Sequence, residues 1–165
     1  MKLESLHDLY IQELRDLYDA EHQILKALPK MIDATESDEL RDALAAHLME
    51  TEGHVTRLER VFQLHGEDAK AESCDGIEGI LDENKDLLKH DENVAVRDAA
   101  IIAGAQKVEH YEIASYGSVC AWARQMGHTD ALNLLKQTLS EEKQADEKLT
   151  TIASSLNVEA LRPVG

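Results

Sequence analysis

The chain has 165 residues and carries 33 acidic against 17 basic side chains, which gives a net charge of -16. Such a charge disfavours binding to nucleic acid and to anionic membrane surfaces, because both are themselves negatively charged. The length predicts a single domain over residues 1–165, and the sequence contains no run of about 18 apolar residues that would span a membrane.

Apolar residues recur at steps of three and four, which is the period of amphipathic helices. The pattern predicts a first helix over about residues 3–32, where Ser5 begins the helix through a capping pair and Pro29 kinks the last turn. A second helix is predicted over residues 38–65 and is ended by Gly66. Because the turn between them is short, the two helices should form an antiparallel hairpin.

A long crossover over residues 66–93 follows, and we expect a short amphipathic helix within it over about residues 76–90. Two further long helices are predicted over about residues 94–126 and 130–156, separated by a turn at Gly127. No alternating pattern indicates a strand. The expected fold is therefore all-α, with two antiparallel hairpins joined by a long crossover, as in ferritin-like four-helix bundles.

Small side chains are concentrated near the start of the third long helix, at Ala99, Ala100, Ala103, Gly104 and Ala105. Such a stretch lets another helix approach closely. The sequence leaves open whether that helix belongs to the same chain or to a second copy.

Two cysteines, Cys74 and Cys120, lie far apart in the sequence. This spacing matches neither a disulfide framework nor a metal-binding CxxC pair, so we expect two free thiols. The first ten residues contain acidic side chains where a secretory leader would be apolar. We therefore expect a cytoplasmic protein.

Acidic residues interrupt the apolar stripes of three predicted helices. Glu21 lies in the stripe of the first helix, Glu109 and Glu112 in that of the third, and Glu142 and Asp146 in that of the fourth. A buried, unpaired carboxylate is costly and is normally paired or coordinated. The stripes therefore predict a cation among the helices.

The second helix carries His47, Glu50 and His54 on one face. Register supports their placement near the acids of the other helices, because four glutamates lie 14 or 15 residues from the turn of their own hairpin: Glu21, Glu50, Glu112 and Glu142.

The second half of the chain also repeats the first. Each half supplies a carboxylate and then a pair four residues apart, namely Glu21 with Glu50 and His54, and Glu109 with Glu142 and Asp146.

This set of oxygen ligands with one or two imidazoles predicts two metal ions per chain, Fe or Mn, with Zn as a less selective alternative. Calcium fits less well because the sequence has no oxygen-rich binding loop. We expect Glu50 and Glu142 to bridge the ions, and His54 and Asp146 to take equivalent places at the two ions. The predicted ligands are Glu21, Glu50, His54, Glu109, Glu112, Glu142 and Asp146. His22, His47 and His110 are expected outside the ligand shell, with His47 as the best further candidate among them.

The chain resembles the YciE/YciF stress-protein family, itself similar to ferritins and rubrerythrins, in the runs AEHQILKALPKM, HLMETEGHVTRLERVF, VEHYEIASYGS and SEEKQADEKL. The resemblance extends over about residues 3–156 and implies a di-metal four-helix bundle, often dimeric, that is linked to stress responses. It places the family's metal ligands on the same seven residues. Two departures stand out: the second helix has Glu50-x-x-x-His54 in place of Glu-x-x-His, and the fourth supplies Asp146 but no histidine.

These features support three hypotheses. The first is an oxidoreductase-like di-metal stress protein that acts on peroxide or O₂, and the second is a non-enzymatic stress protein with a structural metal site. The third is a ferritin-like store, which would need a shell of many subunits. The expected partners are a second copy in a homodimer and a small oxidant, not nucleic acid or a membrane. No catalytic residue is assigned.

Overall fold

This computed structural model describes residues 3–89 and 93–162 of the chain. The described part contains five α-helices and no strand. They are α1 (Leu6–Ala34), α2 (Asp38–His65), α3 (Asp75–Leu87), α4 (Val94–Gln125) and α5 (Thr129–Ala160). The all-α prediction is confirmed. The bounds of α2 are those predicted, and α5 ends four residues later than expected. His90, the predicted end of the short helix, lies outside the described residues.

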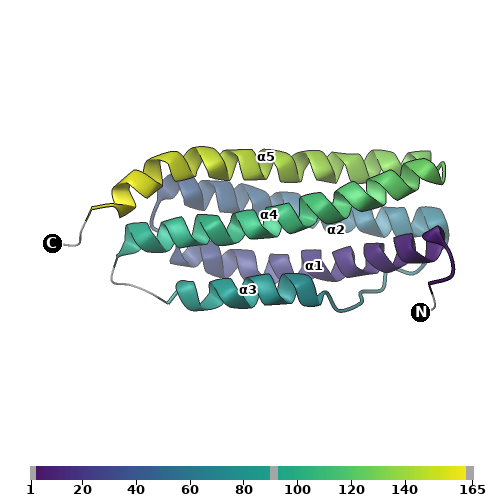
Figure 1. Cartoon of the computed structure of the whole chain (residues 1–165), viewed down its shortest axis with the longest axis horizontal. Helices are drawn as coiled ribbons and strands as arrows, with labels where there is room; N and C mark the ends of the chain where they lie inside the picture. Colours follow the sequence, from purple (N-terminus) through teal and green to yellow (C-terminus); the bar gives the residue numbers. More distant parts are fainter. Residues whose placement is uncertain (1–2, 90–92, 163–165) are drawn as a thin grey trace.

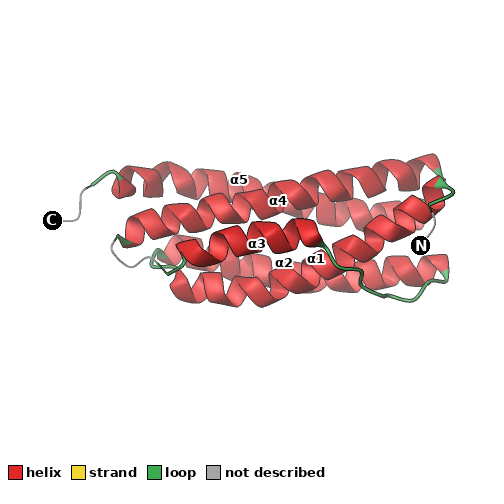
Figure 2. Ribbon diagram, turned by 60° about the horizontal axis from the view of Figure 1, so that its bottom comes forward, coloured by secondary structure: helices red, strands yellow, loops and turns green. Residues whose placement is uncertain are grey.

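The four long helices lie side by side, and α3 packs against α1 and α4 on the outside (Figure 1). Short turns join α1 to α2 and α4 to α5, as the hairpins predicted from the sequence require. The segment after α2 runs back along the outside of the bundle to α3 (Figure 2). It is held on α1, because the amide of Glu72 donates to the carbonyl of Arg15 at 3.2 Å and Arg15 pairs with Glu67 at 3.0 Å.

Local signals in the sequence explain where the helices begin and end. The Ser5 hydroxyl accepts a hydrogen bond from the amide of Asp8 at 3.1 Å and caps α1. Gly66 and Gly127 adopt φ values of 69° and 74°, a left-handed conformation that favours glycine and ends α2 and α4. Pro29 does not end α1, which continues to Ala34.

Apolar side chains form two separate cores along the bundle. One core contains Tyr10, Leu14, Leu17, Phe62 and Val119, and the other contains residues such as Ile24, Leu28, Leu44, Ile102 and Ile152. Each fully buried large aliphatic side chain stabilises the fold by about 1.5–3 kcal/mol. In α1 the change from one core to the other occurs between Leu17 and Ala20, and Glu21, which has no exposed surface, follows directly.

The contact between α3 and α4 depends on two glycines. A Cβ atom on Gly104 would lie 2.5 Å from Cγ of Asn84, and one on Gly76 would lie 2.7 Å from the ring of Tyr111. The Tyr111 hydroxyl donates to Asp16 of α1 at 2.8 Å, which ties α4 to α1 beside α3. At Gly104, therefore, the helix that approaches the small-residue stretch is α3 of the same chain.

Candidate metal centre

Six ionisable side chains from all four long helices meet in the layer between the two apolar cores. None has more than 6% of its surface exposed, and four have none. They are Glu21 of α1, His47 and His54 of α2, Glu109 and Glu112 of α4, and Glu142 of α5. A layer so rich in carboxylates is stable only where protons or cations balance the charge.

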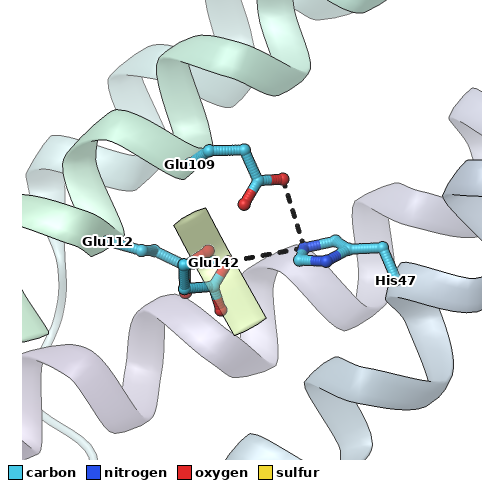
Figure 3. A group of neighbouring side chains, drawn as sticks. All are labelled: His47, Glu109, Glu112 and Glu142. Atoms are coloured by element: carbon cyan, nitrogen blue, oxygen red, sulfur yellow. Dashed lines mark ion pairs between the residues drawn. The ribbon is translucent and has the colours of Figure 1, made fainter. Parts of the chain in front are cut away.

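The first set of ligand atoms comes from His47, Glu109, Glu112 and Glu142, and one atom of each lies within 4.8 Å of all the others. Figure 3 shows the two glutamates of α4 and the one of α5 turned towards the imidazole. His47 Nε2 lies 3.3 Å from Glu109 Oε1 and 4.0 Å from Glu142 Oε2. One imidazole and three carboxylates are a donor set that suits a divalent transition metal.

The second set comes from Glu21, His54 and Glu142, again with one atom of each within 4.8 Å of the others. His54 Nδ1 lies 2.8 Å from Glu142 Oε1 and 3.4 Å from Glu21 Oε1. The Tyr116 hydroxyl donates a short hydrogen bond to Glu21. Glu142 is thus the one residue that belongs to both sets.

Burial and mutual repulsion govern the charges of this layer when no metal is bound. Burial, reinforced by Glu142 and Glu21, raises the pKa values of Glu109 and Glu112 well above their ordinary value. Burial opposes the charge on His54, but its contacts with Glu142 and Glu21 outweigh that effect and raise its pKa to about 10. Burial also opposes the charge on Glu142, yet its contacts with His54 and Glu109 lower its pKa to about 2. Protons therefore occupy part of the layer in the metal-free protein.

Several oxygen atoms of the layer lack partners. Both carboxylate oxygens of Glu112 and Oε2 of Glu109 are buried and make no hydrogen bond within the described part of the chain. Buried polar atoms without partners are rare and costly in folded proteins. These atoms, together with the neighbouring imidazoles, fit a bound cation.

A salt bridge outside the layer orients His54. Its Nε2 lies 3.0 Å from Oε2 of Glu141, and both oxygens of Glu141 accept hydrogen bonds from Arg57 Nη2, at 2.9 and 2.6 Å. Arg57 also donates to the hydroxyl of Thr138 at 2.7 Å. With its Nε2–H donating to Glu141, a neutral His54 presents an unprotonated Nδ1 to Glu21 and Glu142, as a metal ligand must.

A cavity of about 280 Å³ reaches the first set from the side, between α2 and α5. Its wall includes His47 and Glu109, and the small side chains of Ala43, Ala46 and Ala145 leave it open. Glu50 also lines it, and its side chain is 45% exposed. The cavity gives a small molecule or an ion a route to this set.

A family model described as a domain of unknown function (DUF892) matches residues 5–162. The chain is also 44% identical to Protein YciF of Escherichia coli (strain K12) over 154 residues, which cover 93% of each protein. The chain belongs to the YciF family. The resemblance seen in the sequence is thereby confirmed.

Solved structures of YciF relatives share this fold. The crystal structure of the E. coli stress protein YciF superposes with a TM-score of 0.89 at 43% identity, covering 93% of this chain and 97% of that one. YcfI from Rhodopseudomonas palustris gives the same TM-score and identity over 91% of this chain and 96% of its own. No described helix of this YciF-family chain is both long and apolar enough to cross a membrane.

Five of the seven residues predicted as ligands take part in the two sets, and two do not. Glu50 lies at the cavity wall, with Oε2 3.7 Å from His47 Nδ1. Asp146 is half-buried, lies 3.2 Å from His110 Nε2 and accepts a hydrogen bond from Gln106. The roles of Glu50 and Asp146 as ligands remain predictions for this YciF-family protein.

The structure also brings in residues that the sequence pattern had placed elsewhere or passed over. His47, expected outside the ligand shell, supplies a ring nitrogen to the first set. Glu141 and Arg57 were missed because each is a charged residue beside its stripe. The available signal was Arg57 itself, which lies three residues after His54 on α2.

Proposed function

We propose that this YciF-family protein is a stress-related, ferritin-like protein that binds a carboxylate-bridged pair of metal ions, Fe or Mn, with Zn as an alternative. The observation that carries the proposal is the sharing of Glu142 by two sets of ligand atoms. A carboxylate with one oxygen towards each set can bridge two ions and spread their charge. The fold and the mixture of oxygen and imidazole donors are consistent with di-metal four-helix bundles.

Bound Fe or Mn would supply redox chemistry towards peroxide or O₂. The chain itself contributes the ligands, with Glu21 and His54 on one side of Glu142 and His47, Glu109 and Glu112 on the other. Glu141 keeps His54 in the tautomer that binds metal. The two apolar cores keep water away from the layer along the bundle axis, and the cavity between α2 and α5 admits a small oxidant.

The test is metal content combined with peroxide consumption. Protein purified without chelators is expected to hold about two ions per chain. Glu142→Ala should lose both ions, whereas His54→Ala should lose mainly one. Glu147→Ala, which removes an exposed carboxylate from the same helix, is the control. Less than half an equivalent of Fe, Mn or Zn in the metal-replete protein would refute the proposal.

A second candidate function is a stress protein whose metal is purely structural. Its support is that the donors are buried and come from all four long helices, so that bound ions would link the helices together. Metal that raises the thermal unfolding midpoint while peroxide is not consumed would favour this candidate. The expected homodimer, single domain and cytoplasmic location also remain proposals, and sedimentation velocity tests the first.

A further inference from the structure

Three histidines gather at the end of the bundle where α1 begins and α2 ends. They are His7 in the first turn of α1, His65 at the end of α2 and His128 in the turn before α5. The ring centroid of His7 lies 5.9 Å from the ring centroid of each of the other two histidines, and the centroids of His65 and His128 are 4.6 Å apart. Fourteen residues of α1 separate His7 from Glu21, or about 21 Å, so this group is distinct from the candidate metal centre.

The spacing of the rings is that of a tris-imidazole metal site. With metal–nitrogen bonds of about 2.0–2.1 Å, the ring centroids of three imidazoles around a tetrahedral ion lie about 5 Å apart. The observed separations of 4.6 to 5.9 Å bracket this value. The rings now pack edge to face, so binding requires the imidazoles to rotate until one nitrogen of each ring points to a common ion.

The surroundings of the three rings also point to a ligand. His128 Nε2 is buried and makes no hydrogen bond with any residue that the structure describes. His65 Nε2 lies 3.2 Å from the hydroxyl of the buried Tyr10, which leaves Nδ1 of His65 for an ion. An open hollow of about 440 Å³ borders His65 and His128 and has room for an ion and its water.

Chemistry separates this group from the candidate metal centre. The centre is rich in carboxylates, which suit Fe²⁺ and Mn²⁺, whereas three neutral imidazoles suit Zn²⁺, Ni²⁺ and Cu²⁺. His7 is exposed at the start of α1.

We propose that His7, His65 and His128 form a second metal site, for Zn²⁺ or another late transition-metal ion. An ion there links the first turn of α1, the end of α2 and the α4–α5 turn, three segments that no other ligand set joins in the described residues. The site does not depend on the candidate metal centre.

The experiment is titration of the full-length, chelator-stripped protein with Zn²⁺ and Cu²⁺. We expect the variant with His7, His65 and His128 all changed to Ala to bind one Zn²⁺ per chain fewer than wild type. Each single change should weaken this site at least tenfold. In the Glu142→Ala background, where the candidate metal centre is lost, one Cu²⁺ per chain should show nitrogen hyperfine splitting in its electron paramagnetic resonance spectrum, and adding His128→Ala should remove that signal. His110→Ala, which removes another exposed histidine, should retain it.

The outcomes separate the two sites. Glu142→Ala should lose the ions of the candidate metal centre and keep the tris-imidazole ion. His7→Ala, on an exposed residue, gives a variant that folds even if His65→Ala does not. Equal Zn²⁺ stoichiometry and affinity in wild type, His7→Ala and the triple variant would overturn the proposal, whatever the result at the centre.

Discussion

Glu109 and Glu112 keep their protons to higher pH in the folded, metal-free protein than in the unfolded chain, because burial and the neighbouring carboxylates raise their pKa values. The folded state then binds more protons than the unfolded state between the two pKa values, so stability is lost as pH rises through the folded pKa. The raised pKa of His54 acts in the same direction, since its contribution is full below pH 6.5 and is lost through about pH 10. The lowered pKa of Glu142 acts in the opposite direction, since its contribution is full above about pH 4.5 and is lost as pH falls through about 2.

Glu109→Gln should therefore raise the free energy of unfolding of the metal-free protein at pH 7, because glutamine matches the protonated side chain without requiring a proton. The gain in the free energy of unfolding is about 1.4 kcal/mol for each pH unit of an interval that begins at the unfolded pKa. The interval ends at the folded pKa or at the pH of the experiment, whichever is lower. The variant should differ little from wild type near pH 4. Urea denaturation of chelator-treated protein from pH 4 to 8 measures the free energy of unfolding of wild type and variant at each pH. The control is Glu147→Gln, at an exposed position. A metal-free variant less stable than wild type at pH 7 would mean that Glu109 is paired favourably as a carboxylate.

Glu141→Gln tests the orientation of His54. Glutamine keeps the size of the side chain but weakens its bonds to Arg57 and to His54 Nε2. Loss of such a partner typically lowers metal affinity about 10–100-fold. We expect this loss only at the ion that His54 binds, and not at the ion bound through His47. Calorimetric titration with Mn²⁺ separates the two binding steps, and Glu141→Asp should recover part of the affinity. Equal weakening of both steps would indicate a general structural effect instead.

At the scale of the elements, α4 holds the turn of the neighbouring hairpin. Asp98 of α4 is 2% exposed, and its carboxylate accepts hydrogen bonds from the amides of Glu36 at 3.1 Å and Ser37 at 2.8 Å. These amides precede α2, where a helix start has unpaired donors and favours negative charge. The contact is a cap that one helix supplies to another.

Asp98→Ala should lower the free energy of unfolding by about 1.5–3 kcal/mol, the usual value of hydrogen bonds to a charged group. Asp98→Asn should retain part of the stability. Asp42→Ala, which removes an exposed carboxylate from α2, should change it little. Thermal unfolding of the four proteins makes the comparison, and equal midpoints for Asp98→Ala and Asp42→Ala would exclude the capping role.

The periodicity of α2 shows how far the sequence alone could go. At about 100° per residue, Thr51 and His54 lie within about 40° of His47 on the helix, whereas Glu50 lies about 60° to one side. A stripe pattern identifies the buried face, but it does not decide whether a residue at the edge of the face reaches the centre. That depends on how α2 packs on α5. Glu50 is such a residue: it lies on the predicted face but at the cavity wall, outside the two ligand sets.

The link from Arg57 through Glu141 to His54 could not be predicted for a related reason. It joins α2 to α5, and the sequence pattern did not establish which helices of the two hairpins are neighbours. The helices, the hairpins and the meeting of Glu21, Glu112 and Glu142 required only periodicity and register. The contacts around these residues could be identified only once the arrangement of all the helices in the bundle was known.

At the scale of the whole molecule, the candidate metal centre joins all four long helices, so ions bound there should stabilise the protein as one unit. An ion at about 1,000 times its dissociation constant stabilises the folded state by about 4.1 kcal/mol. For a chain of this size that corresponds to a rise of about 8–16 °C in the unfolding midpoint. Calorimetry with Mn²⁺ and then excess chelator measures the rise and its reversal. Glu142→Ala should show no rise, and a rise that persists in this variant would place the stabilising ion elsewhere.

Helix α4 meets a different neighbour at almost every turn. Asp98 caps α2, Gly104 and Tyr111 receive α3 and reach α1, Glu109 and Glu112 enter the candidate metal centre, and Tyr116 binds Glu21. It has 13 buried residues, more than any other described helix, so α4 has the least freedom to accept substitutions. A designer who wished to recode this protein could rewrite much of the outer faces of α2 and α5, but would have to transplant α4 almost whole.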